Sequence, residues 1–509
     1  MKGSTYKRCK CRGADGKELA SRCPQLRHSD GTWNPRHGTW YFYLELDPGP
    51  GGKRRRIRRG GFTSQEDAEN ALEDARCRAL RGLNPGVRYT VGQYLDQWLA
   101  DHRGLRRSTR KSYGEHIEYY LKPHLGHIDL DQLCIAHLTE MFAAIEADNE
   151  RISCVAGERR RLHAAARQAW RSGDKAAHKA ARAELAGLPP HRRTVGAATM
   201  QRIRATLRSA LADAVGQGLV TVNVAKLTKL QIGKRPKALV WTAERVTAWQ
   251  TAYERELAAE RERAGGRTGN AFKIWVSLPR PSRVMVWTPE QTGIFLDHAA
   301  GHPLYPLFHL MAFRGLRRGE ACGLAWPDLD LAAASLIVRE NRVKITYQEI
   351  EDGAPKTDAG DDTVPLDSGT VTVLQTHRRR QEQARDEWGQ AWQASGKVFT
   401  REDGSALHPD HVTDTFARLA YGAGLQPIRL HDLRHGAATL MLAGGADMKL
   451  IQAMLRHSSL AITADTYTSV LPEIAREAAE AAVALVPRKI PAQEARTPVL
   501  PTSSQGEEE

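Results

Sequence analysis

Six side chains in the second half of this sequence could together break and rejoin a phosphodiester. That chemistry needs a nucleophile in line with the bond, positive charge on the non-bridging oxygens, and a proton for the leaving oxygen. Arginine suits the second task, because its fork pairs with two phosphate oxygens and keeps its charge. The candidates, in chain order, are Arg317, Lys356, His431, Arg434, His457 and Tyr467.

Each residue type indicates a role. Arg317 and Arg434 could clamp the two non-bridging oxygens. His431 lies three residues before Arg434, so on a helix the two would share a face, and a pKa near neutrality would let His431 take a proton. Lys356 could protonate the leaving 5′ oxygen, and Tyr467 could form a covalent phosphotyrosine. That link conserves the bond energy, so we expect catalysis without ATP and without a metal.

Each of these residues has an ordinary explanation when it stands alone. An isolated Arg317 is usually a surface or salt-bridge residue, His457 a helix cap or core histidine, and Tyr467 a half-buried packing residue. The prediction therefore depends on the joint order and spacing of the six.

Composition favours a globular chain of several domains with a polyanionic partner. The 509 residues carry a net charge of +15, and 41% of them are hydrophobic. No apolar stretch approaches the ~18 residues that would cross a bilayer, and no signal-peptide segment follows Met1. Seven cysteines are few for this length and argue against a secreted disulfide scaffold. We expect a cytoplasmic, nucleoid-associated protein that binds nucleic acid and no membrane.

Residues 1–85 are predicted to form a small sheet packed on one helix. The β-branched and aromatic run Thr39–Leu46 indicates a strand, a Pro/Gly turn follows it, and Thr63–Ala68 opens a helix with a capping signature. The returning strand is basic enough to read a DNA groove, and a solvated basic hairpin is the alternative. Its candidate DNA-contacting residues are Lys53, Arg54, Arg55, Arg56, Arg58 and Arg59.

Three early cysteines allow two interpretations. Cys9, Cys11 and Cys23, with His28 or His37, have the residue types of a Cys3His zinc site. A single residue between Cys9 and Cys11 is tight for a zinc knuckle. The second interpretation, free thiols in a loose N-terminal segment, is therefore the favoured one.

The centre of the chain, residues 88–230, is predicted to be all helical. Residues 150–193 within it are rich in Ala and Arg with little apolar periodicity, so we expect an inserted helical protrusion. A solvated charged helix is favoured over a DNA contact there. The other helices are expected from Thr90, from a Ser108–Thr109 cap, and over Leu133–Ile145 and Ala198–Val215.

The last part of the chain is predicted to be a mainly helical domain, residues 286–486, joined by a linker or insert at 231–283 with a surface helix at Tyr253–Arg263. Thr288 has the sequence of a helix N-cap. Residues 487–509 are rich in Pro, Ser and Glu and are expected to be disordered. A small sheet is expected from Ser335–Val338 and Thr363–Leu366, with Lys356 on the turn between them.

Residues 286–472 resemble the catalytic domain of the tyrosine recombinase, or phage-type integrase, family. The resemblance lies in short motifs that are jointly specific and cover a little over a third of the chain. They are Gly-Leu-Arg-Arg-Gly-Glu at 315–320, Pro-Lys-Thr at 355–357, His-Asp-Leu-Arg-His at 431–435, and Leu-Arg-His-Ser-Ser at 455–459 followed by Thr463–Tyr467.

The resemblance implies a multidomain, mainly α fold with small β-sheets. Residues 1–85 are similar to sheet-plus-helix arm-binding domains of integrases from actinobacterial mobile elements, residues 88–230 to all-α core-binding domains, and the rest to an α+β catalytic domain. It further implies supporting roles for Glu320 and Asp432, and a Leu471–Val486 helix that docks on a neighbouring protomer.

The implied function is site-specific recombination through a 3′-phosphotyrosine. The implied partners are double-stranded DNA with core and arm sites, a synaptic tetramer that resolves a Holliday junction, and an excisionase or host DNA-bending factor. A dedicated resolvase, a relaxing topoisomerase and a non-catalytic DNA-binding regulator are the alternatives. The presence of all six candidate residues argues against the non-catalytic regulator, since a protein that only binds DNA does not need Tyr467. Asp361 and Asp362 stand where many relatives carry Arg, so that loop is expected to point away from phosphate.

Overall fold

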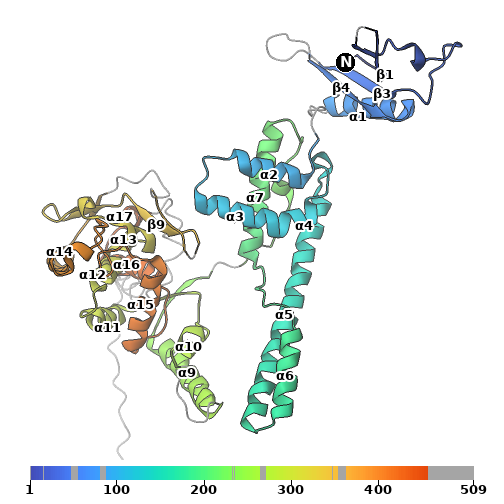
Figure 1. Ribbon diagram of the computed structural model, residues 1–509. Helices are drawn as coiled ribbons and strands as arrows, with labels where there is room; N and C mark the ends of the chain where they lie inside the picture. Colours follow the sequence, from blue (N-terminus) through green and yellow to red (C-terminus); the bar gives the residue numbers. More distant parts are fainter. Residues whose placement is uncertain are drawn as a thin grey trace, which may run out of the picture. The chain divides into compact units, whose positions relative to one another are not determined.

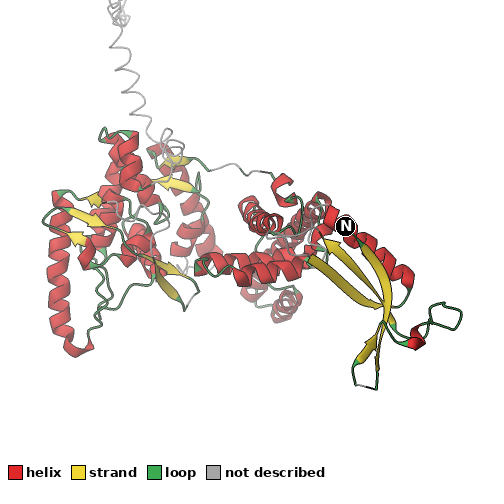
Figure 2. Cartoon of the chain, turned by 90° about the horizontal axis from the view of Figure 1, so that it is seen from above, coloured by secondary structure: helices red, strands yellow, loops and turns green. Residues whose placement is uncertain are grey.

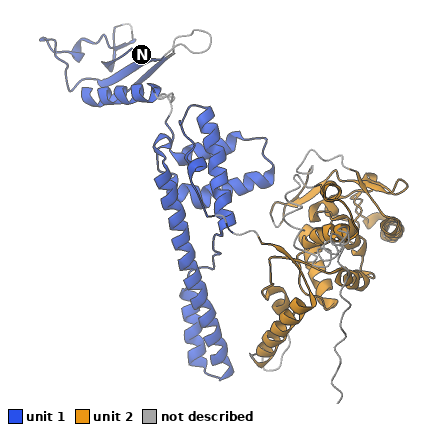
Figure 3. Cartoon of the chain, turned by 180° about the vertical axis from the view of Figure 1, so that it is seen from behind, with its two compact units in different colours: residues 1–234 blue, residues 235–509 orange. Residues whose placement is uncertain are grey.

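The computed structural model describes residues 2–14, 16–46, 55–80, 88–231, 233, 236–263, 271–346, 348–353 and 363–456. The chain divides into two compact units, residues 1–234 and 235–509 (Figure 3). Helices predominate and the sheets are small (Figure 2), as the sequence predicts. No helix in the described ranges has the length and apolar character needed to cross a bilayer.

The first unit begins with a four-stranded antiparallel sheet, in the order β2-β1-β3-β4, with one helix packed on it (Figure 1). Phe42 and Leu44 of the sheet pack against Leu72 and Ala75 of the helix. The prediction of a loose N-terminal segment is wrong, because residues 3–12 form an inner strand of this sheet. The elements are β1 Gly3–Arg12, β2 Glu18–Ala20, the 3-10 turn η1 Pro24–Leu26, β3 Thr39–Leu46, β4 Arg55–Phe62 and α1 Gln65–Leu80.

A helical bundle follows in the same unit. Its buried core includes Tyr94, Trp98, Phe142 and Leu207. Thr90 caps α2 with a reciprocal capping box, as predicted, whereas the cap expected at Ser108–Thr109 is wrong. The elements are α2 Val91–Asp101, α3 Arg107–His116, the π-helical turn η2 Ile117–Leu121, α4 Lys122–Leu125, η3 Leu130–Gln132, α5 Ile135–Arg171, α6 Lys175–Gly187, α7 Ala197–Gly216 and α8 Val224–Leu227.

The Ala/Arg-rich stretch is helical, as predicted. Helix α5 is 37 residues long, and α6 returns along it (Figure 1). Leu162 and Ala166 of α5 are buried, as are Ala181 and Leu185 of α6. Small residues in the seam let the two helices pack closely, so this hairpin has an apolar seam of its own.

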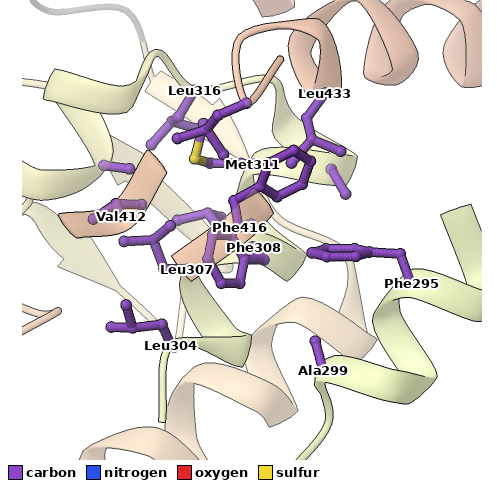
Figure 4. Packing of buried hydrophobic residues seen from close by; sticks show 14 of the residues in the cluster. Phe295, Ala299, Leu304, Leu307, Phe308, Met311, Leu316, Val412, Phe416 and Leu433 are labelled. Atoms are coloured by element: carbon purple, nitrogen blue, oxygen red, sulfur yellow. The ribbon is translucent and has the colours of Figure 1, made fainter. Parts of the chain in front are cut away.

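The second unit is built round one large hydrophobic core. Phe295, Phe308 and Phe416 form its centre, with ring centroids 5.0–5.8 Å apart (Figure 4). The helices of this unit are α9 Ala243–Arg263, α10 Ala271–Ser277, α11 Pro289–Ala299, α12 Tyr305–Arg314, α13 Arg318–Gly323, α14 Ser368–Trp388, α15 Pro409–Gly422, α16 Asp432–Ala443 and α17 Met448–Leu455, with short η4 Trp326–Asp328 and η6 Gly389–Ala391.

The described part of the segment that the sequence placed in a linker or insert, which includes Trp241 and Trp275, packs into this core. Trp249 and Tyr253 of α9 are buried and stacked, so the helix is not simply a surface helix. Strands β5 (Ala238–Val240) and β6 (Val284–Val286) pair in parallel, with Val240 opposite Val286. The first residues of two similar stretches, Val-Trp-Thr at 240–242 and 286–288, are thus paired with each other.

The small sheet differs in one respect from its prediction. β8 (Ser335–Ile337) pairs with β11 (Thr363–Pro365) as expected, beside the two-residue strand β7 (Leu329–Asp330). A separate hairpin, β9 (Asn341–Lys344) and β10 (Ile350–Gly353), is inserted between them. The expected single turn is therefore wrong, because the connection is long enough to form strands of its own.

Candidate active site

Arg317 is positioned by a tight junction between two helices. Helix α12 ends at Gly315, whose φ of +62° is left-handed, and a Cβ there would lie 2.5 Å from Leu455 Cδ2. The chain then turns at once into α13. Arg317 is the N-cap of α13, and 43% of its side chain is exposed. Glycine at 315 thus allows the close approach that places Arg317 at the surface.

Glu320 connects two arginines beneath that surface. It is 3% exposed, and its carboxylate accepts from Arg317 Nη1 at 2.6 Å and from Arg456 Nη2 at 2.5 Å. Burial alone would raise the pKa of Glu320, but the charges of Arg456 and Arg317 outweigh it and hold the pKa below its usual value. Glu320 is therefore a buried carboxylate that fixes both guanidinium groups.

Arg434 lies deeper, at 2% exposure, and ties three segments together. Its Nη1 donates to the carbonyl of Gly315 at 2.6 Å, and its Nη2 donates to the carbonyl of Leu455. Arg317 Nη2 donates to the next carbonyl, that of Arg456, at 3.4 Å. Both predicted phosphate-binding arginines thus hold the backbone that immediately precedes His457.

His431 lies at the start of helix α16, one turn before Arg434. It is the N-cap and exposed, whereas Arg434 is inside the helix and buried. Partial burial of the ring lowers the pKa of His431, and the positive charges of Arg434, Arg429 and Arg317 lower it further. A lowered pKa favours the neutral, proton-accepting form of the imidazole.

Asp432 supports the loop that presents His431. It is fully buried, and its carboxylate accepts from Arg429 Nη2 at 2.6 Å, Arg429 Nε at 3.0 Å and the Arg429 backbone N–H at 3.0 Å. A forked pair of this kind restricts both partners. Asp432 thereby fixes the turn from residue 429 to His431.

Two residues of this network were missed by the sequence reasoning. Arg456 pairs with Glu320 and has the left-handed φ of 51°, which is uncommon for a residue with a side chain. Arg429 is the partner of Asp432. The sequence held one clue to each, because Arg456 directly precedes His457 and Arg429 lies three residues before Asp432. An arginine at such a position is too common to be singled out.

Three of the six candidates, Lys356, His457 and Tyr467, lie outside the described residues. So do Asp361, Asp362, Lys53 and Arg54, the helix expected over Leu471–Val486 and the tail at 487–509. The roles given to them remain predictions.

The N-terminal sheet places its basic residues on two faces. Ile57 and Arg59 lie opposite Leu44 and Phe42, on the side of α1, and burial lowers the pKa of Arg59. The exposed residues Arg56 and Arg58 lie opposite Glu45 and Tyr43, on the open face, where Arg56 stacks on Tyr43 with its guanidinium carbon 4.7 Å from the ring centroid. Arg55 lies in the same strand.

One basic residue on the open face was not foreseen. Arg8 lies on β1 opposite Thr39, and its guanidinium carbon is 5.6 Å from the centroid of the Tyr41 ring. Arginines interleaved with tyrosines form a surface suited to a nucleic-acid backbone, because each guanidinium is held by an aromatic ring.

Three segments match known families. Residues 290–473 match the phage integrase family, residues 90–142 the phage integrase N-terminal SAM-like domain, and residues 34–76 the Arm DNA-binding domain. The first range contains all six candidate catalytic residues, including the three outside the described part of the chain.

Curated relatives include a "Tyrosine recombinase XerC-like" protein of Caldanaerobacter subterraneus, 33% identical over 211 residues, and the ICEBs1 integrase of Bacillus subtilis, 26% identical over 200 residues. Each match covers 39% of this chain and 54% of the relative, so the chain spans about half the length of the curated relatives it matches. A solved Tn1549 transposon integrase in complex with circular intermediate DNA is 16% identical, with a TM-score of 0.47, over 77% of this chain and 99% of that one. These last values are too low to support a conclusion about fold or function.

Proposed function

Since this chain belongs to the phage integrase family, we propose that it is a site-specific tyrosine recombinase that integrates and excises a mobile DNA element. One observation carries the proposal. The arginines of two separate motifs, Arg317 and Arg434, bond to successive carbonyls just before His457, with the buried Glu320 beneath them. Motifs more than a hundred residues apart thereby meet at one site.

The proposed reaction uses these groups as follows. The phosphate lies against the exposed side of Arg317, and Arg434 reinforces the charge from below. Neutral His431 takes the proton of the Tyr467 hydroxyl, whose oxygen attacks phosphorus. The bond to the 5′ oxygen breaks and Lys356 gives that oxygen a proton, leaving a 3′-phosphotyrosine and a 5′ hydroxyl. Attack by the 5′ hydroxyl of a second duplex reverses the step and frees the tyrosine.

The proposed partners follow from the matched segments. The catalytic and SAM-like segments would hold the core site, and the open face of the N-terminal sheet would bind arm sites through Arg8, Arg56 and Arg58. A synaptic tetramer and an excisionase or host DNA-bending factor complete the proposed assembly, which would act at the nucleoid. We propose that cleavage itself uses no metal, because the cations already supply the charge on the phosphate.

The test is covalent capture on a nicked suicide DNA that carries the core site of the element. Wild type should give an SDS-resistant adduct in the presence of EDTA, and Tyr467→Phe should give none. Tyr119→Phe, at an exposed tyrosine in the first unit, is the matched control and should behave as wild type. Tight binding without an adduct by wild type would overturn the proposal and favour the non-catalytic regulator.

Paired sites separate the remaining alternatives. A recombinase exchanges strands between two core sites, whereas a relaxing topoisomerase removes supercoils from a plasmid with a single site. Relaxation that is independent of paired sites would favour the topoisomerase. Exchange that proceeds equally well without arm sites would favour a dedicated resolvase.

A further inference from the structure

We propose that Cys9, Cys11, Cys23 and His37 bind one zinc ion that holds the N-terminal lobe, residues 3–38, in its fold. The four ligand atoms all lie within 4.8 Å of one another. His37 Nε2 is 3.5 Å from Cys11 Sγ and 3.5 Å from Cys23 Sγ. Tetrahedral zinc, with Zn–S near 2.3 Å and Zn–N near 2.0 Å, sets sulfur and nitrogen about 3.6 Å apart. The observed spacing is that of ligands of a single ion.

The fold removes the objection that the Cys-x-Cys spacing raised. Cys9 and Cys11 are two residues apart on β1, so they start from the same side of the strand. The pairing of β1 with β2 shifts by one residue between Cys9 and Arg12, which is a bulge. A bulge bends the strand and re-aims its side chains, so both sulfurs can converge on one point.

The other two ligands come from separate segments. Cys23 lies at the N-cap of η1, and His37 lies two residues before β3. His28, the other histidine weighed from the sequence, is exposed and lies outside this group. The ion would therefore join strand β1 to two loops.

The part of the lobe that lies between β1 and β3 has little regular secondary structure. Between β1 and β3, the described residues contain only the three-residue elements β2 and η1. Its buried cluster consists of Cys9, Cys23 and Leu26, with Cys11, Leu19 and Trp33 partly buried against it. Half of that cluster is cysteine, so without a metal the core would be a few apolar side chains. Lobes of this size usually need a metal or a disulfide.

A single zinc ion fits better than the other occupants of such a cluster. A disulfide would pair two sulfurs and leave one cysteine and the imidazole unused, and a reducing cytoplasm disfavours it. An iron–sulfur cluster spreads its ligands round two or more irons, farther apart than these four atoms. Three thiolates with one imidazole, with no open coordination position, is a known form of structural zinc site.

The zinc site would prepare the arm-binding face. Arg8, on the open face of the sheet, lies next to Cys9, so an ordered lobe fixes its position. The Arm DNA-binding match begins at residue 34, so three of the four ligands precede it. This consequence rests on the proposed function, whereas the zinc site itself does not.

The primary experiment is metal analysis of the full chain, purified under reducing conditions. Wild type should hold about one zinc per chain, and Cys23→Ser and His37→Ala should lose it. Cys77→Ser and Cys134→Ser, at exposed cysteines, are the matched controls and should keep it. Wild-type zinc no higher than that of a variant lacking Cys9, Cys11 and Cys23 would overturn the proposal, as would iron in its place.

A second measurement keeps the proposal testable where a ligand variant fails to fold. Cobalt added to the metal-free wild type should give the visible bands of tetrahedral thiolate-bound Co²⁺, and zinc should abolish them. A chelator should make three further thiols reactive in the native chain. Equal thiol reactivity with and without the chelator, or a disulfide in the lobe, would contradict the site.

The zinc site and the recombinase proposal can fail separately. Covalent capture on a core-site DNA should persist in chelator, while affinity for arm-site DNA should fall. Loss of capture with normal zinc content would contradict only the recombinase proposal. Capture by a chain that binds no zinc would contradict only the zinc proposal. Zinc loss without any change in arm-site affinity would overturn the link between the two.

Discussion

The N-terminal lobe and the candidate active site bring together distant residues in opposite ways. The candidate active site, formed by Arg317, Glu320, Arg434, Asp432 and their partners, is called the pocket below. In the pocket, Glu320, Arg434 and Asp432 are each at most 3% exposed, beside a large core centred on Phe308. In the lobe, cysteines themselves make up half of a small cluster. The pocket is therefore positioned by packing and paired charges, and the lobe, on our proposal, by a bound ion.

The difference predicts that the two regions are sensitive to different changes. Buried charges are costly unless they are paired, so the pocket should be sensitive to the loss of one partner. A lobe with a small core should be sensitive to loss of its ligand, because metal binding and folding are there the same event. The following changes test that contrast, from the largest expected effect to the smallest.

Glu320→Ala should be the most damaging change in the pocket. It leaves Arg456, 9% exposed, without its carboxylate partner. Removing one member of a buried pair costs about 3–5 kcal/mol, and urea denaturation of the full chain would measure it. Glu382→Ala removes an exposed pair with Arg378 and should cost about 0–1 kcal/mol. Equal losses in the two variants would show that the pocket does not depend on paired burial.

Arg317→Ala should separate chemistry from stability. The side chain is 43% exposed, and Glu320 keeps Arg456, so the unfolding free energy should change little. The rate of covalent capture in a single turnover should fall by about 10²–10³, the usual effect of losing one donor to a developing charge. Arg378→Ala, at an exposed site, is the control. Unchanged capture by Arg317→Ala would remove this residue from the mechanism.

His435 should make the pocket sensitive to acid. Burial and the charges of His431, Arg429 and Arg434 lower the pKa of His435 to about 4, although Asp432 opposes them. An unfolded histidine titrates near 6.5, so the stabilising effect is complete above that pH and is lost as pH falls towards about 4. The ring is partly exposed, so we expect a loss of about 1–2 kcal/mol over this range.

The measurement is the unfolding free energy as a function of pH. His435→Gln should flatten the curve in this window, and His411→Gln, at an exposed histidine, should leave it as in wild type. A steeper fall in the His435 variant would contradict the assignment.

Several predictions that rest on neighbouring residues are confirmed, although the cap expected at Ser108–Thr109 is wrong. Contacts between distant residues were not predicted. The alternating run at Thr39–Leu46 and the Thr288 cap are fixed by neighbouring residues, and both are confirmed. The packing of Trp249 into the large core of the second unit depends on partners far along the chain. Periodicity carries no information on such partners.

The absence of information on distant partners also explains which site residues were predicted and which were missed. Glu320 and Asp432 were expected to be supports because a known motif contains them, and in the structure each buried carboxylate pairs with an arginine, Arg456 and Arg429 respectively. Arg429 was missed because an arginine three residues before an aspartate is common. The Cys-x-Cys pair was judged too tight, because the bulge that re-aims it depends on pairing with β2.

Gly38→Ala should have the smallest effect on the pocket, because its change is confined to the lobe. Gly38 follows His37 with a φ of +74°, and a Cβ there would lie 2.5 Å from the Arg8 carbonyl oxygen and 2.7 Å from Leu26 Cδ2. A left-handed backbone alone costs a residue with a side chain about 1–2 kcal/mol, and the clash would also displace His37. We expect zinc affinity, measured by competition with a chromophoric chelator, to fall by about tenfold or more.

Gly31→Ala is the matched control for that change. Gly31 has a similar φ of +85°, but a Cβ there would meet nothing within 4 Å. It carries the backbone strain without the clash, so the difference between the two variants isolates the displacement of His37. Covalent capture on core-site DNA should be unchanged in both, because the pocket does not depend on the lobe for its packing. Equal zinc affinities for the two variants would mean that His37 is not held by this turn, and would weaken its place among the four ligands.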